Sequence, residues 1–307
     1  MVDLSVEFLG INFKNPLILA SGFLGVTASS LINVINNGAG GITIKSLGPE
    51  QRRGHPSPTI ITWEGGMMNA VGLSNQGIDK GIEEIDEFKK RCDAPLIVSI
   101  FAFKQNLFGE LAKKIDKTKA DLLEINISCP NVESEAGTPF ALDVDAAYSV
   151  TKFVKENTTK PVIVKLSPNS LNIAQIAKAC EDAGADAINM GNTLGPGLLI
   201  NIEAAKPILS NKFGGLSGSS IKPITLKRVW DIYENVRIPI LGTGGVSNGR
   251  DAIEMIMAGS TLVGVGTAMY KRCIQVFDEI TKEMIGFMNK NNYDSIKEMI
   301  GKAHENW

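Results

Sequence analysis

Residues 161–190 have the sequence PVIVKLSPNSLNIAQIAKACEDAGADAINM, and this stretch contains one complete strand–helix–strand unit. The apolar runs Pro161–Leu166 and Ala185–Met190 are predicted strands, and Asn172–Ala183 between them has the spacing of an amphipathic helix. An asparagine suits the start of this helix, and Gly184 follows its end. The nearly continuous apolar character of both runs is typical of parallel strands buried on both faces.

The same alternation continues along the whole chain. The other predicted strands are Leu17–Ala20, Gly41–Lys45, Pro95–Ala102, Ala120–Ile127, Pro239–Gly242 and Leu262–Gly266, and the clearest other helical stretches are Leu107–Lys117, Val144–Glu156, Lys222–Glu234 and Gly249–Ala258. Eight such alternations predict an α/β fold of the (β/α)₈ TIM-barrel type. A doubly wound open sheet is the alternative, but the segment Ala20–Gly25 after the first strand lacks its glycine fingerprint.

Composition limits the class of protein. The chain has 307 residues, 44% of them hydrophobic, and a formal net charge of −2. We expect one barrel domain over residues 1–307, with long active-site insertions at Ser46–Lys80 and Gly191–Ile221 and a short helix within Asn291–Trp307. The charge gives no reason to expect nucleic acid, and the absence of a long apolar run or signal sequence predicts a cytoplasmic protein without a membrane span.

The cysteines and histidines exclude several kinds of site. Four cysteines stand far apart, without a Cys-x-x-Cys pair, and the two histidines are His55 and His304. We therefore expect no bound metal, no local iron–sulfur motif and no conventional histidine-assisted nucleophile.

One cysteine has an unusual setting. Cys129 lies in the segment Asn-Ile-Ser-Cys-Pro-Asn, which spans residues 126–131 and follows a predicted strand. The proline turns the chain out of the sheet, and Asn126 and Asn131 place amide groups on either side of the thiol. This pattern is consistent with a thiol that moves a proton beside a polar substrate, although a buried structural cysteine is the alternative.

Polar residues follow the predicted strands, where the catalytic residues of a barrel lie. Lys45 and Lys165 end two strands, and neither can be buried without an anionic partner, which predicts an anion in the pocket. Glycines follow the last two strands at Gly244-Gly245 and Gly266-Thr267. Backbone N–H groups at these positions commonly bind phosphate.

These motifs together resemble the class 1 dihydroorotate dehydrogenase family of FMN-containing barrels, from about Leu9 to Gly301. The segments that carry the resemblance are Asn15-Pro16, Ala20-Ser21-Gly22, Lys45-Ser46, Asn69-Ala70-Val71-Gly72-Leu73, Asn126–Asn131, Val164–Pro168, Gly214–Pro223, Gly242–Val246 and Val265–Ala268. The resemblance implies oxidation of dihydroorotate to orotate in pyrimidine biosynthesis.

The resemblance also implies roles for individual residues. Cys129 matches the catalytic base that takes the C5 proton, and Lys165 would offset negative charge on the reduced flavin. The positions implied for FMN are Ser21, Lys45, Ser46, Ser99, Asn126, Lys165, Gly191, Gly218, Gly244, Gly245, Gly266 and Thr267. Those implied for the substrate are Lys45, Asn69, Ala70, Val71, Gly72, Leu73, Asn126, Asn131, Asn192 and Thr193. An unperturbed thiol pKa of about 8.5 predicts activity that rises toward alkaline pH.

Three features depart from the family pattern. Ser99 stands where the NAD-linked class usually has asparagine, Gly191 stands where isoleucine is usual, and the candidate lid Val132–Ala141 differs from the well-known versions. The segment Gly215–Gly218 and the pair Asn192-Thr193 are more similar to class 1B than to class 1A. The resemblance then implies a homodimer that joins a partner subunit carrying FAD and a [2Fe–2S] cluster in a heterotetramer, with NAD⁺ as the acceptor.

Four alternatives remain open at this stage. A class 1A homodimer would pass its electrons to fumarate. The pyrimidine-reducing domain of dihydropyrimidine dehydrogenase shares the barrel and the Ser-Cys-Pro motif but typically has histidine in place of Asn131. A tRNA dihydrouridine synthase would need a basic surface, which the net charge of −2 disfavours. A barrel that only binds a phosphorylated ligand would leave Cys129 and the two lysines without a role.

Overall fold

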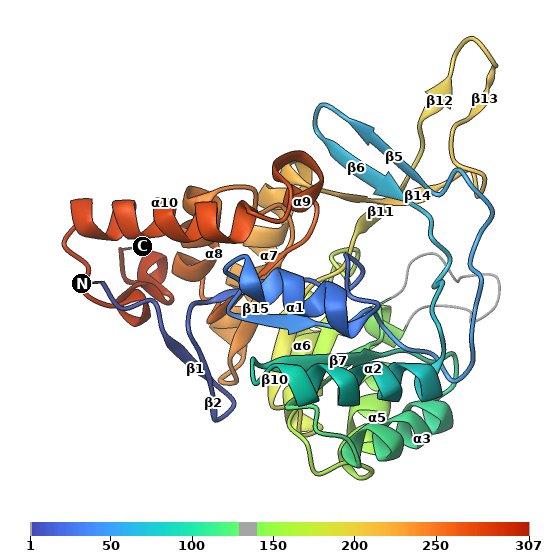
Figure 1. Cartoon of the computed structure of the whole chain (residues 1–307), viewed down its shortest axis with the longest axis horizontal. Helices are drawn as coiled ribbons and strands as arrows, with labels where there is room; N and C mark the ends of the chain where they lie inside the picture. The colour runs from blue at the N-terminus through green and yellow to red at the C-terminus, as the bar shows by residue number, and fades with distance from the viewer. Residues whose placement is uncertain (1, 129–139, 307) are drawn as a thin grey trace.

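The computed structural model describes residues 2–128 and 140–306, and eight of its strands close into a parallel barrel (Figure 1). The barrel strands are β3 (Leu17–Leu19), β4 (Gly41–Thr43), β7 (Leu96–Ile100), β8 (Leu122–Asn126), β9 (Val162–Leu166), β10 (Ala187–Met190), β15 (Ile240–Thr243) and β16 (Leu262–Val265). Each predicted run coincides with one of these strands, although β15 extends one residue past its run to Thr243, so the predicted fold class is confirmed. All five residues of β9 are buried, as expected for a strand covered on both faces.

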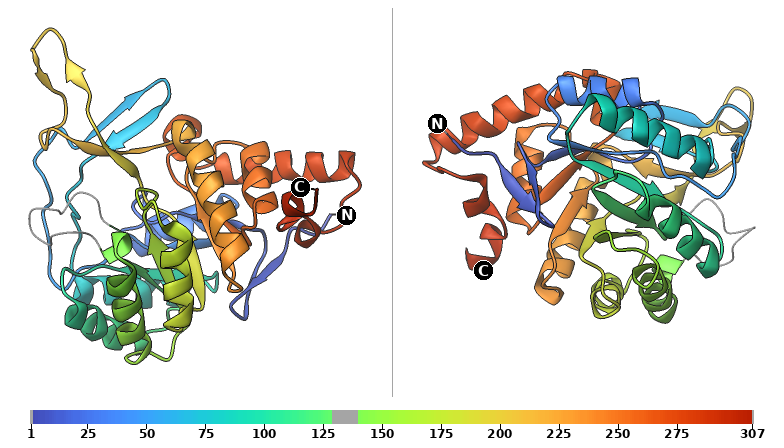
Figure 2. Two further views of the ribbon diagram at one scale, coloured as in Figure 1. Left: turned by 180° about the vertical axis from the view of Figure 1, so that it is seen from behind. Right: turned by 60° about the horizontal axis from the view of Figure 1, so that its bottom comes forward.

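Helices alternate with the strands and pack around the outside of the barrel (Figure 2). They are α1 (Ala28–Asn36), α2 (Ile78–Arg91), α3 (Gln105–Asp116), α5 (Val144–Lys155), α6 (Ile173–Asp182), α7 (Lys222–Asn235), α8 (Gly249–Met257) and α10 (Val276–Lys290), with the short α9 (Ala268–Arg272) before the last. Helix α6 buries Ile173, Ile176 and Ala177, which lie on one face of the helix. Asp143 and Asn248 cap α5 and α8 through their side chains, whereas Asn172 makes no side-chain cap bond.

The two long insertions pair with each other above the barrel. Strands β5 (Ile60–Trp63) and β6 (Gly66–Asn69) come from the first, and β11 (Leu194–Gly197) and β14 (Gly214–Ser217) from the second. They form an antiparallel sheet in the order β11-β14-β6-β5, and the hairpin of β12 (Ile200–Asn201) and β13 (Lys206–Pro207) extends away from it (Figures 1 and 2). Segments more than a hundred residues apart thus build one platform over the strand ends.

The segment around Asp3, near the start of the chain, pairs with residues 294–296, near its end. The hairpin of β1 (Val6–Phe8) and β2 (Ile11–Phe13) precedes the barrel, and Asp3 exchanges backbone hydrogen bonds with Asp294 and Ile296. The predicted final helix is instead two 3₁₀ turns, η3 (Ile296–Met299) and η4 (Lys302–Asn306). Gly301, with φ of +71°, interrupts them, because a left-handed residue cannot continue a helix. None of the described helices is long and apolar enough to cross a bilayer.

Candidate active site

Two adjoining cavities lie at the C-terminal ends of the barrel strands. A narrow one of about 80 Å³ is lined by glycines after β15 and β16, and a wider one of about 410 Å³ lies between the barrel and the upper sheet. They share six lining residues, namely Ser21, Phe23, Lys165, Asn192, Thr193 and Ser217. One elongated ligand could therefore occupy both.

The wall of the narrow cavity at Gly244 and Gly245 has no room for a side chain at either position. Gly245 has φ of +84°, and a Cβ atom there would lie 2.6 Å from Lys222 Cα. Gly244 has φ of +143°, and its Cβ would lie 2.5 Å from Thr225 Oγ1. Within the described residues, the N–H groups of both glycines donate no backbone hydrogen bond. Gly218, Gly266 and Thr267 line the same cavity, so the predicted phosphate positions come together.

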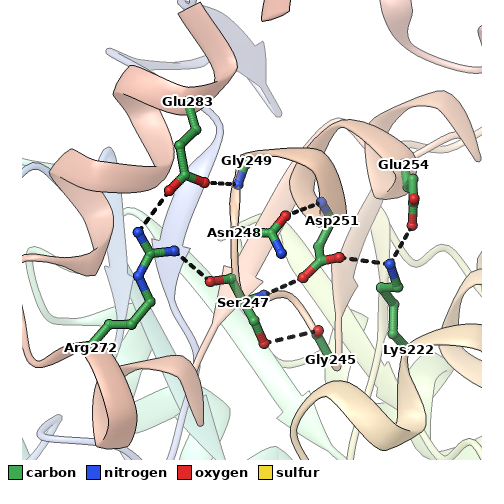
Figure 3. A network of polar contacts seen from close by, with 9 residues as sticks. All are labelled: Lys222, Gly245, Ser247, Asn248, Gly249, Asp251, Glu254, Arg272 and Glu283. Atoms are coloured by element: carbon green, nitrogen blue, oxygen red, sulfur yellow. Dashed lines mark hydrogen bonds and ion pairs between the residues drawn. The ribbon is translucent and has the colours of Figure 1, made fainter. Parts of the chain in front are cut away.

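Ion pairs hold the loop that carries these glycines (Figure 3). Asp251 accepts the backbone N–H of Ser247 at 2.9 Å and a hydrogen bond from Lys222 Nζ at 2.6 Å. Lys222 also binds Glu254, and burial lowers its pKa less than these two carboxylates raise it, so the net pKa lies above the ordinary value. From the other side, Arg272 donates to the carbonyl oxygen of Ser247 at 2.7 Å. The loop after β15 is thus fixed from both sides.

Arg272 is itself held by carboxylates, and the same contacts reach the start of α8. Its guanidinium donates to Glu279 and Glu283. Glu283 also accepts the backbone N–H of Gly249, as Figure 3 shows. Asn248 caps α8 by accepting from Asp251 N at 3.0 Å. Both cations beside the glycine loop are therefore neutralised by carboxylates, which leaves the backbone N–H groups as the groups that a phosphate would meet.

The opposite side of the site is built from neutral side chains. Ser46 Oγ lies 2.8 Å from Ser99 Oγ and accepts from Asn126 Nδ2 at 3.3 Å. Asn192 Nδ2 donates to Ser128 Oγ at 2.9 Å and to Asn126 Oδ1 at 3.4 Å. Ser46, Asn126 and Asn192 all line the wider cavity, where amide and hydroxyl groups give directional hydrogen bonds to a polar ligand.

Two lysines reach this site from strand ends on different sides of it. Lys165 is 5% exposed and lines both cavities, and no described carboxylate pairs with it. Lys45 lines the wider cavity, and burial lowers the pKa of its ammonium group. A buried ammonium that no carboxylate of the described residues pairs with is consistent with the prediction of an anion in the pocket.

Comparison with known proteins gives the family. Residues 3–288 match the family model described as dihydroorotate dehydrogenase. The catalytic subunit of dihydroorotate dehydrogenase B (NAD(+)) from Methanocaldococcus jannaschii is 43% identical over 98% of both chains. The subunit of the same name from Pyrococcus furiosus is 41% identical, over 99% of this chain and 100% of its own. The chain belongs to the dihydroorotate dehydrogenase family.

A solved structure supports the fold of this dihydroorotate dehydrogenase family member. DHODH from Eimeria tenella in complex with ferulenol has a TM-score of 0.84 at 23% identity, over 98% of this chain and 89% of that one. The resemblance to class 1 enzymes of the B type is confirmed by the sequence relatives. The family is flavin-dependent. The glycine cradle, formed by Gly244 and Gly245 with the adjoining strand ends, fits the phosphate of a flavin, and the neighbouring cavity lined by Lys165 fits its ring.

Most predicted site residues converge on the two cavities. Those that line them are Ser21, Lys45, Ser46, Asn69, Val71, Gly72, Leu73, Asn126, Lys165, Gly191, Asn192, Thr193, Gly218, Gly244, Gly245, Gly266 and Thr267. At Gly191 a Cβ would lie 2.6 Å from the carbonyl oxygen of Leu166, so the isoleucine usual in the family would not fit here. Their assignment to FMN or substrate stays a prediction.

Two predicted residues lie behind the cavity walls. Ser99 is completely buried and contacts Ser46 and Glu124, and it lines neither cavity. Ala70 is also completely buried and packs with Met68 and Leu209 beneath the upper sheet. The assignment of Ser99 to FMN and of Ala70 to the substrate stays a prediction.

The predicted catalytic base and one predicted substrate residue lie outside the described residues. These are Cys129 and Asn131, together with most of the candidate lid 132–141. The residue before the cysteine is described: Ser128 is buried, and its carbonyl oxygen accepts from Asn192 Nδ2 at 3.2 Å. Burial raises the pKa of Cys180 to about 12, so that thiol cannot supply a thiolate near neutral pH.

Sequence reasoning missed several residues of the site. Phe23, Ile60 and Tyr270 line the cavities, and Glu124 and Asn189 form buried hydrogen bonds inside the barrel. Phe23 directly follows Ser21-Gly22 at a strand end, and this position was a signal for a cavity residue. Ile60 and Tyr270 gave no such signal, because the pairing of the insertions and the turn into α9 place them there.

Proposed function

We propose that the chain oxidises dihydroorotate to orotate with bound FMN, as the catalytic subunit of an NAD⁺-linked enzyme of pyrimidine biosynthesis. The chain is 41–43% identical to B-type catalytic subunits over almost its full length, which supports both dihydroorotate oxidation and NAD⁺ as the electron acceptor. The observation that carries the assignment of FMN is the glycine cradle next to Lys165, where a flavin phosphate and the flavin ring would meet different chemistry.

The residues would divide the work along the site. Gly244, Gly245, Gly266 and Thr267 would hold the phosphate through backbone N–H groups. Lys165 would place its positive charge beside the flavin ring, where negative charge accumulates on reduction. FMN, when bound, supplies the acceptor for the hydride that leaves C6 of dihydroorotate.

The residues of the wider cavity would bind dihydroorotate and remove its C5 proton. Asn126 and Asn192 line the wider cavity together with Lys45, and they would orient the pyrimidine ring and its carboxylate. Cys129, which directly follows the buried Ser128 in the sequence, would remove the C5 proton as its thiolate. Activity should therefore rise toward alkaline pH.

Anaerobic reduction tests this function directly. The purified chain, with its flavin spectrum recorded, is mixed with dihydroorotate without oxygen, and bleaching of the flavin is followed by stopped flow. We expect rapid bleaching in the wild type and loss of most of the rate in Cys129→Ala. A flavin that stays oxidised in the wild type would overturn the proposal, and bleaching by uracil-type substrates instead would favour the dihydropyrimidine dehydrogenase alternative.

The acceptor needs a second chain. The chain has four cysteines, of which none forms a Cys-x-x-Cys pair, so a partner subunit with FAD and a [2Fe–2S] cluster would carry electrons to NAD⁺. The term "catalytic subunit" in the names of the relatives supports a partner. We also propose a homodimer of this chain at the centre of the complex, in the cytoplasm.

Co-expression tests the partner. The chain alone should reduce an artificial dye but not NAD⁺, and co-expression with a subunit that carries FAD and a [2Fe–2S] cluster should give NADH formation. Direct reduction of fumarate by the chain alone would instead support the class 1A alternative. Light scattering on both preparations measures the predicted homodimer and heterotetramer.

A further inference from the structure

Glu124 is a buried carboxylate that the proposed reaction does not use. It lies on β8, is completely buried, and points into the barrel interior. Its two oxygens accept from Ser99 Oγ at 2.8 Å and from Asn189 Nδ2 at 2.6 Å. No described cation forms an ion pair with it. Burial of a carboxyl group is costly unless it is hydrogen-bonded, and here each oxygen accepts one hydrogen bond.

The carboxylate fixes the direction of the next hydrogen bonds. Ser99 Oγ donates its single hydroxyl hydrogen to Glu124 Oε1. The contact of 2.8 Å between Ser99 Oγ and Ser46 Oγ then needs a hydrogen from Ser46. Ser46 has no second hydrogen to donate, so toward Asn126 it can only accept.

The same direction reaches the cavity. Asn126 must turn Nδ2 toward Ser46, which leaves Oδ1 to accept from Ser128 N at 3.3 Å, Ser128 Oγ at 3.2 Å and Asn192 Nδ2 at 3.4 Å. Asn192 Oδ1 accepts from Thr193 N at 2.8 Å. Every bond in this series agrees with the direction set by Glu124. The second hydrogen on Asn126 Nδ2 is left for an acceptor on a bound ligand.

We propose that Glu124 is a positioning residue for this site. Through Ser99 it makes Ser46 an acceptor for Asn126 Nδ2, in agreement with the backbone N–H groups of Ser128 and Thr193 that bind Asn126 Oδ1 and Asn192 Oδ1, so that Asn126 meets a ligand that presents an oxygen acceptor. The proposal rests on the proposed function for the identity of that ligand, because orotate carries carbonyl and carboxylate oxygens. It also gives Ser99 a role that needs no contact with the cofactor.

Asn189 provides the internal control. Its Oδ1 is buried, and among the described residues it has no hydrogen-bond partner. In Glu124→Gln the new amide could donate to that oxygen once Asn189 turns over, and its own oxygen would still accept from Ser99. The direction of the series would survive. Glu124→Met removes the acceptor altogether, and Ser99→Ala breaks the series one step later.

Orotate binding to the FMN-loaded variants tests the proposal. The change in the flavin spectrum on titration with orotate gives the Kd without turnover. We expect Kd to rise about tenfold in Glu124→Met and in Ser99→Ala, and to stay within about threefold of wild type in Glu124→Gln. The double variant Glu124→Met/Ser99→Ala should bind orotate as weakly as either single variant, because both substitutions interrupt the same series of hydrogen bonds.

Asp186→Asn serves as a control for the loss of a partly buried carboxylate far from the site. Asp186 accepts from Lys155 at 2.6 Å and from Val162 N at 2.7 Å, and this substitution should lower thermal stability while leaving the orotate Kd unchanged. If Glu124→Met loses stability in the same way but binds orotate as the wild type does, Glu124 is structural only. An equal loss in Glu124→Gln and Glu124→Met would also overturn the proposal, because charge and not direction would then matter.

A readout without ligand separates this proposal from the proposed function. The side-chain amide ¹⁵N–¹H signals of Asn126 and Asn192, assigned by substitution, should shift in Ser99→Ala and remain in place in Asp186→Asn. Unchanged signals in Ser99→Ala would refute the series even if the protein failed to bind orotate. Failure of the wild type to bind orotate, with shifted signals in Ser99→Ala, would refute only the proposed substrate.

Discussion

The two ends of the barrel use the same type of ion pair for different purposes. At the N-terminal end, Asp121 and Asp186 each precede a strand and accept the first N–H of the strand before it, from Leu96 and Val162 at 2.7 Å. Each is also paired with a lysine from a helix, Lys89 and Lys155 respectively. The motif repeats because the strand–helix unit repeats.

At the C-terminal end, the pair of Lys222 and Asp251 holds a loop instead of a strand. The loop carries two glycines at positive φ, and the strand ends around it direct lysines and amides at a cavity. The same kind of ion pair therefore stabilises a strand at one end of the barrel and a ligand-binding loop at the other. An ion pair contributes to stability where the backbone that it holds continues as a strand. It contributes to function where that backbone bends around a ligand site.

The lysines give the largest expected difference between the two ends. Lys165→Ala should slow flavin reduction by dihydroorotate about 10²- to 10³-fold, because it removes a positive charge that the described residues leave uncompensated. Lys155→Ala, at the other end, removes a lysine that is paired with Asp186 and should leave the rate unchanged. Stopped-flow reduction measures both. Similar rates in the two variants would remove the distinction between the ends.

The glycines give the next largest effect. Gly245→Ala combines a positive φ with a Cβ that would lie 2.6 Å from Lys222 Cα, so we expect at least about a tenfold loss of FMN affinity. Gly10, between β1 and β2, has a similar φ of +77° but nothing within 4 Å of its added Cβ. Gly10→Ala should therefore cost about 1 kcal/mol of stability and no FMN affinity. Fluorescence of released flavin on dilution gives the two affinities.

The barrel itself could be predicted from the sequence, because periodicity and local composition determine it. Each of the eight apolar runs became a barrel strand, and polar residues that follow the strands, such as Lys165 and Asn126, meet at one rim. Strand ends of a closed parallel barrel converge whatever the loops do. The glycine cradle was predictable for the same reason.

Contacts between distant segments could not be predicted in this way. The sheet of β6 and β14 pairs Met67 with Ser217, which no local pattern indicates, and it brings Met67 and Ile60 to the cavity. Glu124 lies in an apolar run with no local sign of its role, which depends on Asn189 on β10, two strands away in the barrel. Ser99 was assigned to FMN by resemblance, whereas the structure places it one layer behind Ser46.

Neutralising one carboxylate at each end of the barrel tests what each ion pair contributes. Asp251→Asn keeps the shape of the side chain but weakens its bonds to Lys222 and Ser247, so FMN should bind about three- to tenfold more weakly. Asp186→Asn removes the equivalent pair at the other end and should change only the melting temperature. Equal FMN affinity in the two variants would show that the glycine loop needs no support from Asp251.

The smallest expected effect is a pH dependence of opposite sign for two lysines near the site. Burial lowers the folded-state pKa of Lys45, so between that pKa and the higher unfolded value the unfolded chain binds more protons, and stability rises with pH. The net pKa of Lys222 is raised, so its stabilisation is complete below the unfolded pKa and is lost as pH rises through the folded one. Relative to wild type, Lys45→Met should therefore lose stability, and Lys222→Met gain it, as the pH is raised toward 11. Urea unfolding of the FMN-loaded variants from pH 8 to pH 11 measures both differences. If the stability differences of Lys45→Met and Lys222→Met change with pH in the same direction, the contrast between Lys45 in the cavity and the paired Lys222 beside it is wrong.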